Sequence, residues 1–159
     1  MRKYIAPLLD KFQTRFLREL GISLEDALVH FNLAPLSCRR DMAMLGVLHR
    51  AALGKGPEHF KKFFTLSTAE HHCTRSGQGR HSRQLMDIRN EHFLEIERRS
   101  ALGLIWVYNR LPPEIARHNT VKEFQTSLQH LLKDRVAAGC SDWMITLSPR
   151  VPVYCHPLG

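Results

Sequence analysis

The fold of this chain is decided by residues 101–136, which read ALGLIWVYNRLPPEIARHNTVKEFQTSLQHLLKDRV. The first part is apolar nearly all round, which predicts a deeply buried helix over about 95–111. Thr120 and Glu123 then match the Thr-x-x-Glu capping box that marks the start of a helix. The apolar residues that follow recur at helical spacing, and they are Val121, Phe124, Leu128, Leu131, Leu132 and Val136.

Helical periodicity also runs through the N-terminal part of the chain. It predicts helices over 4–20, 23–32, 37–53 and 58–64, with a short one over 114–117. In the first of these, large apolar residues recur at spacings of three and four: Ile5, Leu8, Leu9, Phe12, Phe16 and Leu20. Ser23 followed by Asp26 resembles a second capping box. Phe60, Phe63 and Phe64 are expected to form the buried side of the fourth helix.

These elements predict an all-α fold of about six to seven helices. Residues 65–83 interrupt the pattern, because they are rich in Ser, Thr, Gly, His and Arg and have almost no apolar periodicity. A loop this long is uncommon in a compact domain, so we expect a basic polar linker over 65–83. It joins an N-terminal helical half, 1–64, to a C-terminal helical half, 84–159, and leaves open whether the halves share one core. The tail from Ser141 contains three prolines and is expected to be irregular.

The charge balance is basic. The 159 residues carry 23 Lys and Arg against 15 Asp and Glu, a formal net charge of +8. Such a balance favours a polyanionic partner such as nucleic acid. The sequence contains no apolar run of the roughly 18 residues that a membrane span needs, so no membrane partner is predicted. The four cysteines are far apart in sequence, which favours free thiols in a reducing compartment, the nucleus or the cytoplasm.

No self-contained catalytic site is predicted, and no cofactor or small-molecule substrate. Gly54-Lys55-Gly56 lacks the remainder of a phosphate-binding loop, and helix termination explains its glycines. Two-metal polymerase chemistry needs clustered carboxylates. The six aspartates are instead isolated from one another: Asp10, Asp26, Asp41, Asp87, Asp134 and Asp142. We therefore expect a chain that is not an enzyme.

A metal site is the strongest alternative in the linker. His71, His72 and Cys73, with His81 beyond them, offer the nitrogen and sulfur ligands that zinc prefers. Structural zinc sites usually combine two closely spaced ligand pairs, and no second pair follows. We therefore predict no metal and treat these side chains as residues of a solvated loop.

Several short basic clusters are the candidate binding residues. Arg and Lys bind phosphates through charge and hydrogen bonds, and a flexible basic segment can fold onto RNA. RNA is therefore expected in preference to DNA. The predicted nucleic-acid-binding residues are Lys61, Lys62, Arg75, Arg80, His81, Arg83, Arg98 and Arg99. The alternative is that these clusters are solvated surface that keeps a basic protein in solution.

Two sets of motifs resemble the C-terminal region, after the thumb, of the reverse transcriptase polyproteins of non-LTR (LINE-like) retrotransposons. The broader match is Val-Tyr-Asn-Arg-Leu-Pro-Pro-Glu at 107–114, followed by Val121, Phe124 and Leu128. The narrower match consists of short strings in a fixed order, at 32–36, 39–46, 49–50, 54–57, 80–85, 99–104, 147–150 and 156–158. Together they cover most of the chain from about Leu20 onward.

The resemblance implies a position within the element and no activity, because the fingers and palm that hold the catalytic carboxylates lie upstream in that family. Two hypotheses follow. One is a non-catalytic, retrotransposon-derived helical module that binds nucleic acid through a basic surface. The other is a structural protein that packs against a larger assembly through the apolar helix at 101–108, Trp143 and the proline-rich tail.

Overall fold

The protein is all-α. A computed structural model describes residues 5–67, 80–87, 100–152 and 155–158. In these ranges there are six α-helices and two 3₁₀ helices: α1 (Ile5–Glu19), α2 (Leu24–Phe31), α3 (Leu36–Ala52), η2 (Glu58–Phe60), α5 (Gly103–Asn109), α6 (Pro113–Ala116), α7 (Val121–Ala137) and η4 (Trp143–Ile145). The only β-type pairing among the described residues is an isolated bridge between Leu66 and Leu85. None of these helices is long and apolar enough to cross a bilayer.

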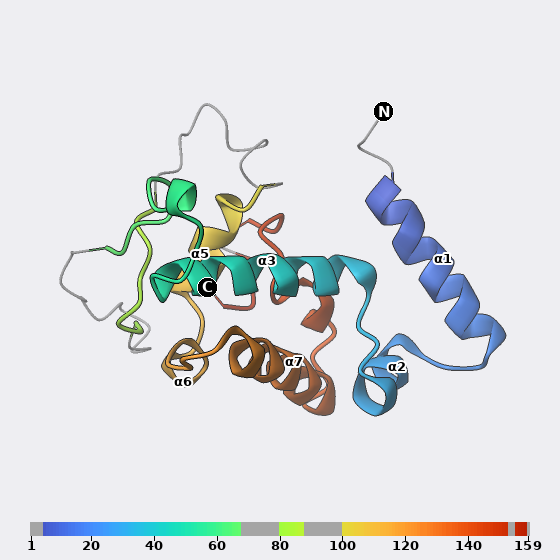
Figure 1. Ribbon diagram of the computed structural model, residues 1–159. Helices are drawn as coiled ribbons and strands as arrows, with labels where there is room; N and C mark the ends of the chain where they lie inside the picture. The colour runs from blue at the N-terminus through green and yellow to red at the C-terminus, as the bar shows by residue number, and fades with distance from the viewer. Residues whose placement is uncertain (1–4, 68–79, 88–99, 153–154, 159) are drawn as a thin grey trace.

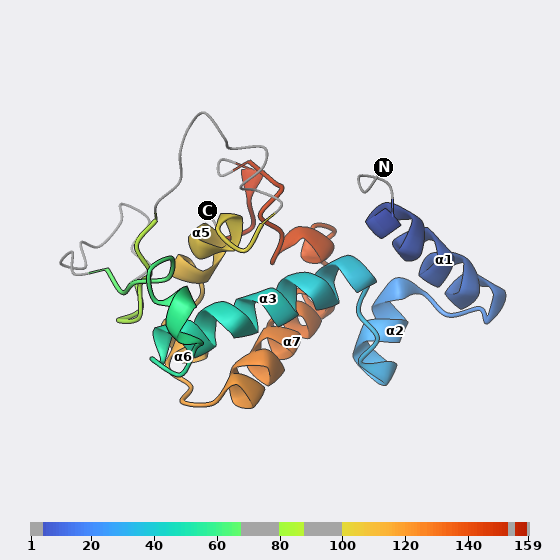
Figure 2. The ribbon, with the colours of Figure 1, turned by 45° about the horizontal axis from the view of Figure 1, so that its top comes forward.

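Helix α3 is the centre of the arrangement. It packs against α7 along its length, and also against α1 and α5 (Figure 1). A second view shows α1 at the opposite end of the molecule from α6 (Figure 2). One hydrophobic cluster contains Leu28 and Leu45 from before the linker and Trp106 and Phe124 from after it. The two parts of the chain therefore share a core.

The predicted helix starts at Ser23 and Thr120 are confirmed. The Thr120 hydroxyl oxygen accepts a hydrogen bond from the Glu123 N–H at 3.2 Å and starts α7. The Ser23 oxygen accepts from the Asp26 N–H at 2.9 Å and starts α2. The Ser23 hydroxyl also donates to the Asp26 carboxylate at 2.7 Å. Asp26 is one carbon shorter than the Glu that is usual at this position of a capping box, and its carboxylate lies beside the hydroxyl.

The apolar helix at the centre of the sequence is the most buried, as predicted. In α5 every residue from Gly103 to Tyr108 is buried. Its predicted first residues fall outside the described part of the chain, and residues 100–102 lie ahead of the helix. The prediction for 58–64 is only partly right, because η2 ends at Phe60. The Phe60 and Phe64 rings pack against each other edge to face, whereas the Phe63 side chain is 43% exposed.

The C-terminal segment returns to the core. Trp143, Leu147 and His156 are all buried, and the His156 ring lies edge-on against Trp106 at 4.4 Å between centroids. The Arg150 guanidinium contacts the buried Asp41 carboxylate on α3 at 3.4 Å. Trp143 and the residues of α5 from Gly103 to Tyr108 are thus enclosed by this chain. They are not at the surface, where the structural-protein hypothesis had placed them.

Candidate nucleic-acid interface

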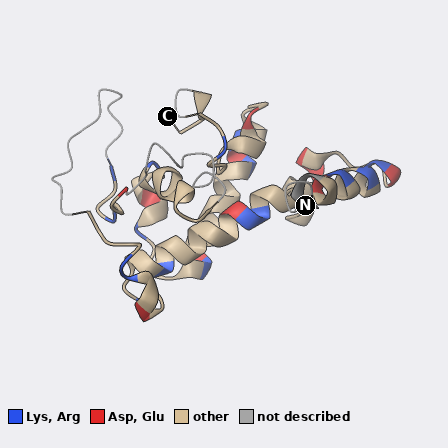
Figure 3. Cartoon of the chain, turned by 90° about the horizontal axis from the view of Figure 1, so that it is seen from above, with Lys and Arg blue, Asp and Glu red and all other residues tan. Residues whose placement is uncertain are grey.

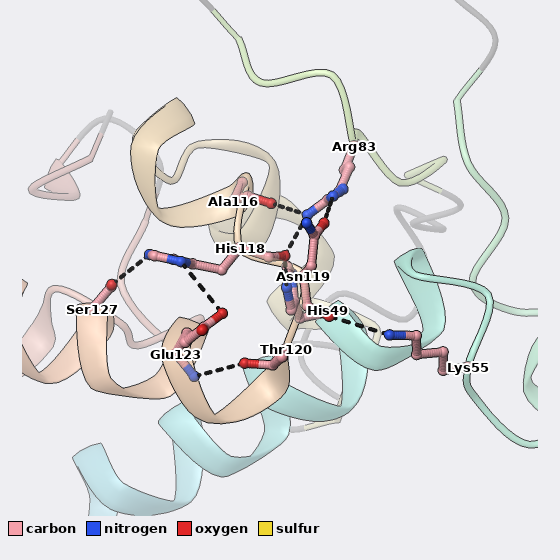
Figure 4. Close-up of polar contacts among 9 residues, drawn as sticks. All are labelled: His49, Lys55, Arg83, Ala116, His118, Asn119, Thr120, Glu123 and Ser127. Atoms are coloured by element: carbon pink, nitrogen blue, oxygen red, sulfur yellow. Dashed lines mark hydrogen bonds and ion pairs between the residues drawn. The ribbon is translucent and has the colours of Figure 1, made fainter.

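The turn that joins α6 to α7, residues 117–120, collects cationic side chains from distant parts of the sequence. The Arg83 guanidinium donates to the Ala116 carbonyl oxygen at 2.7 Å, to that of His118, and to the Asn119 side-chain oxygen at 2.7 Å (Figure 4). The Lys55 ammonium donates to the Asn119 carbonyl oxygen at 3.2 Å. Two cations are therefore held against one turn.

Two further arginines extend this surface. The Arg50 Nε group, near the end of α3, donates to the Lys55 carbonyl oxygen at 3.0 Å. Arg117 is an exposed residue of the turn itself. We call Arg50, Lys55, Arg83 and Arg117 the basic turn surface.

Within the described part of the chain, no ion pair joins this surface to an acidic side chain. Carbonyl and amide oxygens are neutral acceptors, so the bonds of Lys55 and Arg83 fix the side chains and leave their charges intact. The ion pairs found among the described residues include none of the four members of the basic turn surface. The N-terminus of α7, at Val121, adds the positive end of a helix dipole. Glu123, in the first turn of that helix, lies with its carboxylate 3.9 Å from His118 Nδ1.

The buried side chain of His49 is hydrogen-bonded to the turn. His49 Nε2 lies 2.9 Å from the His118 carbonyl oxygen, which can only accept, so Nε2 carries the proton. Nδ1 then accepts from the Tyr108 hydroxyl at 3.0 Å. The His49 ring also stacks on Phe124, with 4.0 Å between centroids and 4° between planes.

Burial keeps this pair in its neutral form. It lowers the pKa of His49 to about 4 and raises the pKa of Tyr108. A general acid or base works best with a pKa near the operating pH, and both groups are moved away from neutrality. The hydrogen bonds of His49 therefore fit a structural role, in which they hold the turn against α3 and α5.

Two of the predicted binding residues, His81 and Arg83, are hydrogen-bonded to residues of the C-terminal half. His81 is buried, donates from Nε2 to the Tyr108 carbonyl oxygen at 2.8 Å, and accepts the Arg83 N–H at Nδ1 at 3.2 Å. Both ring nitrogens are thus engaged inside the protein. Arg83 is half-buried and reaches the turn, while Arg80 is exposed three residues earlier.

The predicted lysines belong to a separate group. The Lys61 ammonium pairs with the Glu58 carboxylate at 2.6 Å, and the Lys62 ammonium lies 4.9 Å from the centre of the Phe63 ring. These contacts stay within residues 58–63 and do not connect the lysines to the basic turn surface. Arg75, Arg98 and Arg99 lie outside the described residues, as do His71, His72 and Cys73. Among the described residues, no group of three or more His, Cys, Asp or Glu side chains is placed to hold a metal.

Sequence reasoning missed Arg50, Lys55 and Arg117. Lys55 was considered only as part of a phosphate-binding loop. Its neighbour Gly54 has a φ of +71° and ends α3, as helix termination predicts. Arg50 and Arg117 are single basic residues outside any cluster, so composition gives no signal for them. Comparison of the chain with family models, with curated proteins and with solved structures finds no match.

Proposed function

We infer that this chain is a non-catalytic, retrotransposon-derived helical module that binds the phosphate backbone of nucleic acid through the basic turn surface. One observation carries the proposal. Lys55 and Arg83, from different segments, are fixed on the same turn by neutral acceptors and keep their charges. Cations that are already oriented lose little side-chain freedom when a phosphate binds. The net charge of +8 supplies the wider attraction.

Single-stranded RNA is the expected ligand. The sequence places a basic cluster immediately before Arg83, and arginine-rich segments are a common means of RNA recognition. Phosphate contacts position a nucleic acid without reading its bases, so the proposed binding has little sequence preference.

The test is fluorescence anisotropy with labelled single-stranded RNA and duplex DNA over a salt series starting near roughly 50 mM. Arg50→Ala plus Arg117→Ala removes two charges from exposed side chains. We expect weaker binding and a log–log salt slope that falls by about 1.4 for a single strand. Arg83→Ala is a poor probe, because it also removes three hydrogen bonds from the turn.

The matched control removes two charges elsewhere. Lys11→Ala plus Arg18→Ala lowers the net charge equally, on α1 at the other end of the molecule (Figure 3). It should leave the slope nearly unchanged. Equal losses in the two double variants indicate generic polycation behaviour and contradict the proposed surface. Absence of binding by a folded protein at low salt contradicts the function itself.

A further inference from the structure

Helix α1 presents a row of large apolar side chains to solvent. Leu8, Phe12, Phe16 and Leu20 are 48%, 67%, 57% and 56% exposed, and Leu9 beside them is 47% exposed. Residues four apart form one slightly slanted ridge on a helix, here roughly 18 Å long. Contiguous exposed apolar surface of this kind marks interaction sites on soluble proteins.

The other side of α1 fixes the direction in which this row faces. Leu17 is buried at 3% exposure against the rest of the protein. The Gln13 side chain donates to the Ala34 carbonyl oxygen at 3.2 Å, and the Asp10 carboxylate accepts from the Ser37 N–H at 3.0 Å. Turning the row inward would break both bonds and expose Leu17.

The border of the row is basic. Lys11, Arg15 and Arg18 are spaced by four and three, so they form a second line along α1 beside the apolar ridge. Glu19 pairs with Arg15 at 3.1 Å and offsets one of the three charges. The Asp10 carboxylate is on the inner side, bonded to Ser37. A net charge of about +2 therefore remains along this border (three cations less one anion).

We propose that the outer face of α1 binds an acidic amphipathic helix of a partner protein. One ridge of about three turns, with charge along one side, fits the groove of a second helix that has apolar residues at i and i+4 and Asp or Glu beside them. A second copy of this chain is a poorer occupant, since it carries the same basic border and the same net charge of +8. A bilayer is also a poorer fit, because an interfacial helix leaves its polar face in water, whereas the inner face of α1 packs against α3.

The test uses the full chain as bait for a displayed library of helical peptides. Each peptide has a fixed apolar i, i+4 row, and the flanking positions are randomised equally between Glu and Lys. We expect selected peptides to be enriched in Glu by at least about tenfold, a shift that matches one strong charge-assisted contact. Lys11→Glu plus Arg18→Glu should reverse that preference toward Lys. Both of these side chains are exposed, so the fold should be retained.

A matched pair of apolar variants locates the site. Phe12→Ser plus Phe16→Ser should abolish selection, while Phe63→Ser, which removes a ring that is 43% exposed near η2, should not. Selection without a charge bias, or selection that survives Phe12→Ser plus Phe16→Ser, overturns the proposal. So do two other results that depend on Phe12 and Phe16: a concentration-dependent dimer in sedimentation equilibrium, and binding to phosphatidylglycerol vesicles without peptide selection. The library contains no nucleic acid, so its result is independent of the RNA measurement.

Discussion

Helices α1 and α7 have nearly the same apolar pattern and opposite surroundings. α1 has 15 residues, with Phe12 and Phe16 in a row that Leu20 continues directly after the helix, and α7 has 17 residues with Phe124, Leu128 and Leu132 in a row. The row of α7 is completely buried. The two aromatic residues of the α1 row are more than half exposed. Periodicity therefore reveals that a helix has an apolar face, and it does not reveal what covers that face.

The largest expected effect is the difference in unfolding free energy between an alanine substitution in the row of α7 and one in the row of α1. Phe124→Ala should lower the free energy of unfolding by about 3–5 kcal/mol, because it leaves a cavity between α3 and α7. Phe16→Ala should change it by less than about 0.5 kcal/mol, since the ring is already in water. Urea unfolding followed by tryptophan fluorescence measures both, because Trp106 and Trp143 are buried. A large cost for Phe16→Ala in dilute monomer would show that this chain itself covers the row.

Much of the α7 region could be predicted from the sequence, for local reasons. The start of the helix follows from Thr120 and Glu123, and its row from spacing alone. The burial of Leu17 was not predictable, because a single leucine on the polar side of the α1 pattern gives no signal by itself.

The same distinction applies to the candidate interface. A cluster of basic residues is visible in sequence, but which acceptors it meets depends on how remote segments pack. Arg83 and His81 contact carbonyl oxygens 25 or more positions away in the chain, at 116, 118 and 108. Lys55 and Arg117 join the surface for the same reason, although neither lies in a basic cluster.

Acid should destabilise the buried core, in contrast to the exposed row of α1. His49 and His156 are buried, and burial lowers the pKa of each to about 4 from an ordinary value of 6.5. Between these values the unfolded chain binds more protons than the folded one, so stability is complete above about 6.5 and falls as the pH drops toward 4. From pH 7 to pH 5 the expected loss is about 1–2 kcal/mol for each histidine. Helix α1 contains no histidine.

Urea unfolding at pH 7 and at pH 5 measures this loss. His49→Gln should lower stability at pH 7 and reduce the difference between the two pH values. His130→Gln, at an exposed position of α7, is the control and should leave the difference as it is. Asp41 works in the opposite direction. Burial raises the pKa of its carboxyl group, although Arg150 and Arg40 oppose that shift. The contribution of Asp41 to the free energy of unfolding therefore decreases as the pH rises. A profile that is flat from pH 7 to pH 5 contradicts the burial of the two histidines.

The smallest expected effect compares two helix caps at the two ends of the molecule. Ser23→Ala removes the bond that starts α2, beside α1, and Thr120→Ala removes the one that starts α7, beside the basic turn surface. Each should cost about 1 kcal/mol of unfolding free energy. Only Thr120→Ala should also weaken RNA binding in the anisotropy assay, because it loosens the turn that carries Arg117. Equal binding by the two variants would mean that the order of this turn does not matter for the ligand, and the phosphate contacts would then have to be sought elsewhere on the chain.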